Sequence, residues 1–311
     1  MRSQRRLVSP QTEVQNPFIT TWDTRNLKTG SSASNQIKLP LQDYSQSSFD
    51  FIVDWGDGTT DNITTYNQAE TLHTYTTEGI KTITITGTII GFSFYLVQAE
   101  TNKILTVENW GIFGSDLVFF YLFRNCINLD MSGVQDVPLY VNPRGIFAGC
   151  TSITTVNNLN NWDTSTADSF WDMFNGCINF NQDVLIDFSN AINIREMFDG
   201  CTLFNSVVSI PTSGSKINNM HESFRNTLNF NQDISDWDVS KVTAALRFMY
   251  LNTAFSTANL DLVYQKWSQQ TVQPNITIGF NGAKYTSAGQ AGRDILTSAP
   301  NNWVISDGGL I

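Results

Sequence analysis

A four-residue phrase recurs through the middle of the chain and limits what it can fold into. Phenylalanine, a variable residue, glycine and cysteine stand together at Phe147–Cys150, Phe174–Cys177 and Phe198–Cys201, with steps of 27 and 24 residues between the phenylalanines. Weaker copies begin at Phe123 and Phe224. A period of this length is typical of stacked units, because one unit is too small to bury its own apolar face. We therefore predict an array that presents an extended surface.

Each unit is predicted to contain a short strand, a tight turn and one or two helical turns. The helical turns are expected in segments that end at Phe174, Phe198 and Phe224. Ser165 and Ser240 precede such segments and are expected to be N-caps, because a hydroxyl accepts a hydrogen bond from the free N–H groups of a helix start.

Two columns of equivalent residues follow from the register of the units. One position is occupied by a cysteine in four units and by Thr227 in the fifth; the cysteines are Cys126, Cys150, Cys177 and Cys201. We predict buried, reduced thiols, because a small residue fits a tight interior corner and a disulfide requires specific geometry. No Cys-x-x-Cys spacing indicates a metal. Asn181, Asn205 and Asn231 form a second column, predicted to bond turn backbone.

The repeat pattern resembles a known family. The order Met-Phe-x-Gly-Cys-x-x-Phe-Asn-Gln-Asp, seen from Met173 to Asp183, resembles the leucine-rich-repeat variant of BspA-like surface proteins, which are common on bacteria and have counterparts in bacterial viruses. Tyr264–Ser268 and Asn302–Gly309 resemble the segment that closes such arrays. The resemblance implies a non-enzymatic adhesion or attachment surface and carries no catalytic residues.

The amino-terminal part has strand signals instead of repeats. Phe49–Val53 alternates apolar and polar residues, and Ile80–Gly87 is strictly alternating and rich in β-branched residues. The run Val-Asp-Trp-Gly-Asp-Gly-Thr, from Val53 to Thr59, and the later His73-Thr74-Tyr75 resemble the polycystic-kidney-disease-type (PKD) immunoglobulin-like module. This resemblance implies a small β-sandwich in which His73 is structural.

The acidic residues of that run allow a second interpretation. Asp54, Asp57 and Asp61 could form a calcium site, but their spacing of one, four and eight differs from the one, three and five of an EF-hand loop. Glycines at 56 and 58 suit the backbone of a tight turn. We therefore predict turn chemistry here and no metal site.

Together these features predict a multidomain α+β protein. A flexible basic tail spans residues 1–16, a PKD-like β-sandwich 17–96, a leucine-rich-repeat-like solenoid 97–255 and a capping segment 256–311.

Charge and hydropathy narrow the range of partners. A net charge of −10 argues against a nucleic-acid surface, which requires clustered basic residues. Arg2, Arg5 and Arg6 are the one basic cluster, predicted to be a solvated tail or a peg into a larger assembly. No apolar h-region follows them, so no secretory signal is expected. The apolar runs Leu117–Phe123 and Ile89–Val97 are too short to span a bilayer.

No catalytic motif or cofactor site is predicted. The chain has two histidines, His73 and His221, and lacks nucleophile-elbow, phosphate-loop and zinc-protease motifs. Trp171 breaks the register of the other tryptophans and is a candidate for stacking on sugar rings. His221 and Glu222 are expected on a solvated helix face. The remaining candidate binding residues are polar side chains of the repeats: Gln182, Asp183, Gln232 and Asp233.

These observations predict a non-enzymatic attachment protein that recognises a host cell surface. The combination of adhesin modules with no export signal favours a spike or receptor-binding protein at the virion surface. Its partners would be a glycan or protein receptor and, through the amino-terminal part, other virion proteins; a homo-oligomer is possible. The alternatives are a BspA-like adhesin on a bacterial cell surface and a purely structural virion component.

Overall fold

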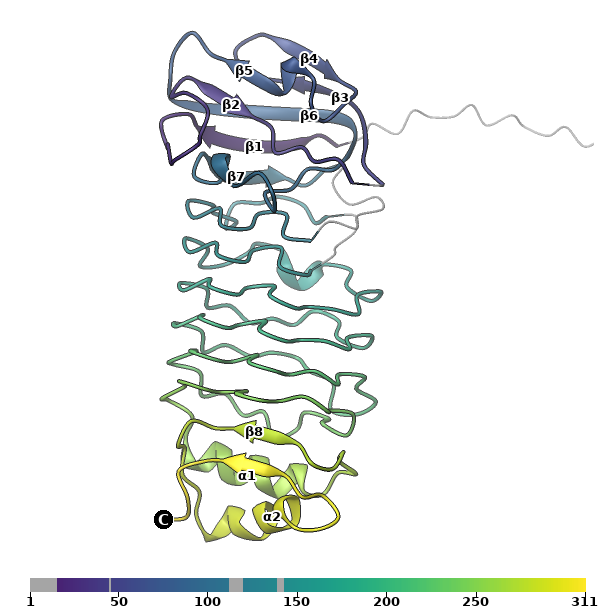
Figure 1. The fold of residues 1–311 in the computed structure, drawn as a ribbon, viewed down its shortest axis with the longest axis vertical. Helices are drawn as coiled ribbons and strands as arrows, with labels where there is room; N and C mark the ends of the chain where they lie inside the picture. Colours follow the sequence, from purple (N-terminus) through teal and green to yellow (C-terminus); the bar gives the residue numbers. More distant parts are fainter. Residues whose placement is uncertain (1–15, 45, 112–119, 139–142) are drawn as a thin grey trace, which may run out of the picture.

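The computed structural model describes residues 16–44, 46–111, 120–138 and 143–311. The molecule is elongated, with a β-sheet at one end, a column of stacked turns in the middle and two helices at the other end (Figure 1). The predicted basic tail with Arg2, Arg5 and Arg6 lies outside the described residues, as do positions 117–119 of the apolar run Leu117–Phe123.

One five-stranded sheet dominates the amino-terminal end. Its strand order is β4-β3-β6-β1-β7. The strands are β1 (Phe18–Asp23), β3 (Ser48–Asp54), β4 (Thr60–Ile63), β6 (Ile80–Ile90) and β7 (Ile104–Asn109). The alternating segments Phe49–Val53 and Ile80–Gly87 fall within β3 and β6, so both strand predictions are confirmed.

The predicted β-sandwich is wrong. Beside the main sheet stands only a ribbon of β2 (Gln36–Lys38) and β5 (Leu72–Thr74), so the sheet is not closed into a sandwich. The edge strand β7 continues instead into the repeats, through a parallel bridge between Thr106 and Asp130. Alternation in a sequence identifies the buried face of a strand but not what covers that face, which is why the pattern misled.

The repeat stack, defined as residues 120–255, also departs from prediction. Its described residues contain no α-helix and no extended strand, only the short 3-10 helix η3 (Leu159–Asn161) and isolated parallel bridges such as Met131 with Val156 and Asn193 with Asn219. The predicted leucine-rich-repeat-like solenoid of strand-plus-helix units is therefore wrong. So is the α+β class, because the chain is mostly sheet and turns with few helices.

Left-handed residues explain the missing helical turns. Asp172 (φ 60°) and Gly176 (φ 72°) flank the segment that was expected to be helical, and Glu196 (φ 54°) and Gly200 (φ 75°) flank the next. A positive φ is incompatible with a right-handed helix, so each unit forms successive tight turns.

The expected N-caps are also wrong. Ser165 donates its N–H to the carboxylate of Asp163 at 3.1 Å, and Ser240 donates to Asp238 at 3.0 Å. The aspartates thus close Asx turns, and the serines are donors within them.

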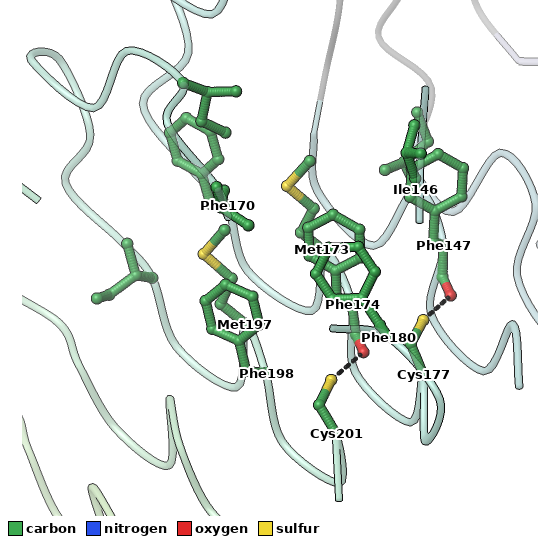
Figure 2. Close-up of a cluster of buried hydrophobic side chains, with 14 of the residues drawn as sticks. Ile146, Phe147, Phe170, Met173, Phe174, Cys177, Phe180, Met197, Phe198 and Cys201 are labelled. Carbon is green, nitrogen blue, oxygen red and sulfur yellow. Dashed lines mark hydrogen bonds between the residues drawn. The ribbon is translucent and has the colours of Figure 1, made fainter. Parts of the chain in front are cut away.

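Aromatic rings form the interior of the stack. The rings of Phe147, Phe174 and Phe198 lie one above another, with centroids 5.7 and 5.8 Å apart (Figure 2). A second column runs through Phe180 and Phe204, 5.9 Å apart. Parallel rings at this spacing bury large apolar areas in contact with each neighbour.

The cysteine thiols bond between units. The Sγ atoms of Cys150, Cys177 and Cys201 donate to the carbonyl oxygens of Phe123, Phe147 and Phe174 at 2.9, 3.0 and 3.0 Å; Figure 2 shows the last two bonds. All four cysteines are buried and free. Burial raises the pKa of each thiol well above its usual value, so the S–H group persists as a donor.

The asparagine column joins units in a similar way. The Oδ1 atom of Asn181 accepts the backbone N–H of Asn205 at 2.9 Å, and that of Asn205 accepts the N–H of Asn231 at 2.9 Å. Asn231 in turn accepts from Ser256, at the start of the cap. The column thus supplies a side-chain acceptor at three successive junctions, in addition to the backbone bonds between units.

The carboxyl-terminal segment continues the stack and ends it with helices. A bridge from Ala245 to Ile278 leads into β8 (Thr277–Gly279), which pairs in parallel with β9 (Val304–Ser306). Helices α1 (Thr257–Trp267) and α2 (Ser287–Thr297) lie beyond them (Figure 1). The two short 3-10 helices outside the stack are η1 (Ala69–Thr71) and η2 (Gln98–Glu100).

Candidate binding edge

Every arginine of the repeat stack stands on one edge. The edge is defined by the turns in which the left-handed residue of one unit donates its backbone N–H to a backbone carbonyl of the next unit. Asp172 donates to Arg195 at 3.1 Å, Glu196 to His221 at 2.9 Å and Glu222 to Leu246 at 3.1 Å. The arginines all lie within three positions of the left-handed residue of their turn: Arg124, Arg144, Arg195, Arg225 and Arg247. We call these turns the arginine edge.

Stacked tyrosines form the amino-terminal end of the arginine edge. The rings of Tyr95 and Tyr121 stack with centroids 5.1 Å apart, and the guanidinium of Arg124 lies 4.7 Å from the Tyr121 ring. Gly145 leaves room for this arrangement, because a Cβ there would collide with the Tyr121 ring. The Tyr121 hydroxyl reaches two units along the stack and donates to the Asp172 carboxylate at 2.7 Å.

Trp171 lies in the middle of the edge between two arginines. The guanidinium carbons of Arg144 and Arg195 are 4.3 and 5.5 Å from its ring centroid. The ring is half-buried, and its indole N–H has no hydrogen-bond partner among the described residues. A sugar that stacked on Trp171 would therefore compete with cations already over the ring, so this residue is not the open platform that the sequence suggested.

Carboxylates beneath the edge hold the arginines in place. Arg195 donates to Glu196 at 2.6 Å, and Arg225 binds Asp199. Burial raises the pKa of Asp199, and the hydrogen bond from Arg225 opposes that rise. Burial also raises the pKa of Asp172; the Tyr121 hydroxyl opposes the rise, and the neighbouring Glu196 charge adds to it.

His221 and Glu222 are not on a solvated helix face, which corrects the prediction. Glu222 is buried at a left-handed position (φ 54°), where it binds Arg247 at 3.2 Å and Arg225 at 3.5 Å. The Nε2 atom of His221 lies 3.6 Å from the same carboxylate. The left-handed backbone turns the Glu222 side chain toward its neighbours, and no local signal in the sequence announces that conformation.

The other four candidate residues lie away from the edge and bond backbone. Asp183 accepts the N–H of Val207 at 2.9 Å, and Asp233 that of Ser235 at 2.8 Å. Gln182 both accepts from and donates to the backbone of Val156, at 2.7 and 3.1 Å. Gln232 donates to the backbone of Asn205 at 2.9 Å.

The structure thus brings Trp171, His221 and Glu222 together on the arginine edge and leaves the other candidates in the scaffold. Sequence reasoning missed the five arginines. They share no single position in the register, because Arg124 and Arg225 directly follow a repeat phenylalanine whereas Arg144 and Arg195 stand three residues before one. The sequence therefore carried no periodic signal for them.

The acidic run near residue 57 forms a turn. Asp54 accepts the N–H of Gly56 at 2.9 Å, and Asp57 accepts the N–H of Thr59 at 3.1 Å, which confirms the turn interpretation. His73 stacks on Trp55 with ring centroids 4.7 Å apart and lies 2.9 Å from the Asp57 carboxylate. Burial raises the pKa of Asp57, but hydrogen bonds from Thr59 and His73 outweigh it and lower the pKa to about 2.

The described residues contain neither a candidate metal site nor a candidate membrane span. Within residues 16–44, 46–111, 120–138 and 143–311, no set of three or more histidine, cysteine or acidic side chains is placed to hold a metal ion. In the same part of the chain, no helix has the length and apolar character needed to cross a bilayer.

Comparison with known proteins places the repeats in a family. The model of the family described as "Mycoplasma protein of unknown function, DUF285" matches residues 121–210 and 185–289, which together make up more than half of the chain. The chain belongs to this family. No curated protein and no solved structure matches it.

The family match agrees with part of the resemblance drawn from the sequence. The matched residues cover the repeats, and the match is compatible with a BspA-like surface protein. The amino-terminal sheet lies outside the matched residues, so the PKD-type resemblance gains no support from it.

Proposed function

We propose that this protein is a non-enzymatic attachment protein that binds a glycan or protein on a host cell surface through its arginine edge. The observation that carries the proposal is the position of the arginines, which occupy five of six successive turns, with Trp171 in the sixth and Tyr121 and Tyr250 beside them. Arginine and aromatic residues are enriched at the energetically important positions of protein interfaces.

The packing of the edge supports binding over catalysis. Glu196, Asp199 and Glu222 each engage an arginine, and Asp172 accepts the Tyr121 hydroxyl. Side chains fixed in this way present a preorganised surface, and preorganisation reduces the entropy lost on binding.

The family match favours a bacterial cell-surface adhesin as the setting for this edge, because the family description names Mycoplasma. A virion spike whose amino-terminal part contacts other virion proteins would use the same edge and is the alternative setting. Immunogold labelling of cells and of any particles that they release separates the two: label on the cell envelope supports the adhesin, and label on particles supports the spike.

Attachment can be tested with beads that carry the intact chain and are incubated with host cells. The double variant Arg124→Gln with Arg195→Gln removes two positive charges from the edge. We expect it to lower the number of attached beads at least tenfold, a loss of about 1.4 kcal/mol or more in binding free energy. The matched control, Lys216→Gln with Lys241→Gln, removes the same charge elsewhere in the stack and should attach normally. Equal attachment by both double variants would refute the proposal.

A further inference from the structure

The arginine edge ends in a pocket where the last repeat meets the cap. The pocket has a volume of about 560 Å³, within the range of roughly 300–1,000 Å³ that is usual for small-ligand sites. The repeat supplies one wall, and the turns around β8 and β9 supply the other. The side chains that matter here are Leu246, Arg247, Tyr250, Asn281, Ser306 and Asp307.

One wall of the pocket is apolar and accessible. Tyr250 is 46% exposed and Leu246 is also 46% exposed, although both belong to a stack whose other large apolar side chains are mostly buried. The guanidinium carbon of Arg247 lies 5.8 Å from the Tyr250 ring centroid, one cation in contrast to the two over the half-buried Trp171. The more exposed tyrosine ring therefore keeps an apolar face, with a polar tip, for the C–H face of a sugar ring.

The charge on this wall comes from Arg247. Its side chain is 56% exposed, and its ion pair joins Nη1 to Glu222 at 3.2 Å. A guanidinium has five N–H donors in a planar fork, so donors remain for a ligand carboxylate. Asp307 is the acidic side chain of the pocket. It is 4% exposed and accepts hydrogen bonds from Arg293 at 2.6 Å and from the Tyr264 hydroxyl at 2.5 Å, so its negative charge is engaged by these partners and not by Arg247.

Polar groups of the cap complete the lining. Asn281 donates its amide N–H to the carbonyl of Asn252 at 2.7 Å, which fixes the side chain and leaves its Oδ1 atom as an acceptor. The hydroxyl-bearing Ser306 lines the same wall. Amide and hydroxyl groups beside an aromatic ring can bond the hydroxyls of a sugar while the ring contacts its carbons.

We propose that this pocket binds a carboxylate-bearing sugar residue. Tyr250 and Leu246 contact the ring, Arg247 binds the carboxylate, and Asn281 accepts a hydroxyl proton. The inference deepens the proposed function by naming the ligand class at one end of the arginine edge, and it rests on that function only for its biological meaning.

The test is a titration of the intact protein, followed by saturation-transfer NMR, with methyl β-glucuronide, methyl β-glucoside and acetate. The two glycosides differ only in the carboxylate. We expect the glucuronide to bind at least tenfold more tightly than either the glucoside or acetate, because a charge-assisted bidentate bond and a ring contact act together. No binding of the glucuronide, or equal binding of the glucoside or acetate, would overturn the proposal.

Variants locate the binding. Tyr250→Ala should abolish the glucuronide signal, and Arg247→Gln should reduce glucuronide affinity to that of the glucoside. Lys241→Gln removes one positive charge outside the pocket and should bind like the unaltered chain. Circular dichroism checks that each variant folds. Unchanged affinity in both folded pocket variants would also overturn the proposal.

The outcome is separable from the test of attachment. If the chain binds glucuronide but its edge variants attach to cells normally, the pocket proposal stands and the proposal that the whole edge mediates attachment is refuted. Attachment that depends on Arg124 and Arg195, with no glucuronide binding, would refute the pocket alone.

Discussion

The amino-terminal sheet and the repeat stack align neighbouring segments by different chemistry. In the sheet, β3 and β6 pair continuously from Ser48 with Ile90 to Asp54 with Thr84, so backbone groups satisfy one another. In the stack the bridges are isolated. Backbone bonds such as that from Phe147 to Met173 at 3.1 Å join adjacent units, and side chains such as Cys177 and Asn205 supply further bonds between them. Backbone bonds survive most substitutions, whereas side-chain bonds depend on residue identity. The stack should therefore be the region more sensitive to single substitutions.

The largest effect is expected for Phe198→Ala. The Phe198 ring is buried between Phe174 and Phe224, with centroids 5.8 and 5.2 Å away, so truncation would leave a cavity between the units. The free energy of unfolding should fall by about 3–5 kcal/mol, as measured by urea denaturation. The control Ile52→Ala, at a half-exposed position of β3, should cost much less. Equal costs would contradict the contrast between the two regions.

A smaller loss is expected for Glu222→Ala. The sequence had suggested a negligible cost, but the buried carboxylate binds Arg225 and Arg247. Removal should lower the free energy of unfolding by about 1.5–3 kcal/mol, the usual range for hydrogen bonds to charged groups. Asp50→Ala, at an exposed position of β3, is the matched control. A loss no greater than that of the control would show that these ion pairs do not stabilise the stack.

Cys177→Ala should cost less again. The substitution removes one thiol-to-carbonyl bond and a small buried volume, so we expect a loss of about 1 kcal/mol. The four thiols of the unaltered chain should react with an alkylating reagent only after unfolding, and a reductant should not shift the melting temperature. A disulfide in a non-reducing peptide map, or rapid labelling of the folded chain, would contradict the buried-thiol column.

The smallest effect is a difference in pH dependence between the regions. The pKa of Asp57 is lowered to about 2, so its contribution to stability is complete above its unfolded value and is lost as pH falls toward 2. The pKa of Asp172 is raised by burial, so its ionisation opposes folding, and that cost disappears as pH falls.

Melting curves of Asp57→Asn and Asp172→Asn between pH 7 and pH 2 test this difference. The melting temperature of Asp57→Asn should lie below that of the unaltered chain at pH 7 and approach it at acid pH. For Asp172→Asn, stability relative to the unaltered chain should decline as the pH falls. If both variants changed in the same direction, the difference between the two regions would not hold.

The sequence predicted some parts of the fold because their signals are local. Alternation identified the strands in β3 and β6, and the repeat register placed Cys150 and Asn205 in columns. The left-handed turns at Asp172 and Glu222 could not be predicted in the same way, because neither residue is glycine. Among the equivalent positions of the units, only position 145 is a glycine, the residue type that indicates a left-handed conformation.

The candidate site was harder to predict than the fold. Trp171, His221 and Glu222 were chosen as single residues, whereas the arginine edge is a property of several units at once. Gln182 and Asp183 drew attention because they are polar and recur, yet they recur because the scaffold needs their backbone bonds.

The thiol-to-carbonyl bonds of the stack join only adjacent units: Cys177 reaches Phe147, and Cys201 reaches Phe174. A duplicated unit would bring its own donor and its own acceptor, so it could be inserted without breaking the bonds on either side. The stack could therefore lengthen or shorten by whole units, and each such change would alter the span of the edge while leaving both ends of the protein intact.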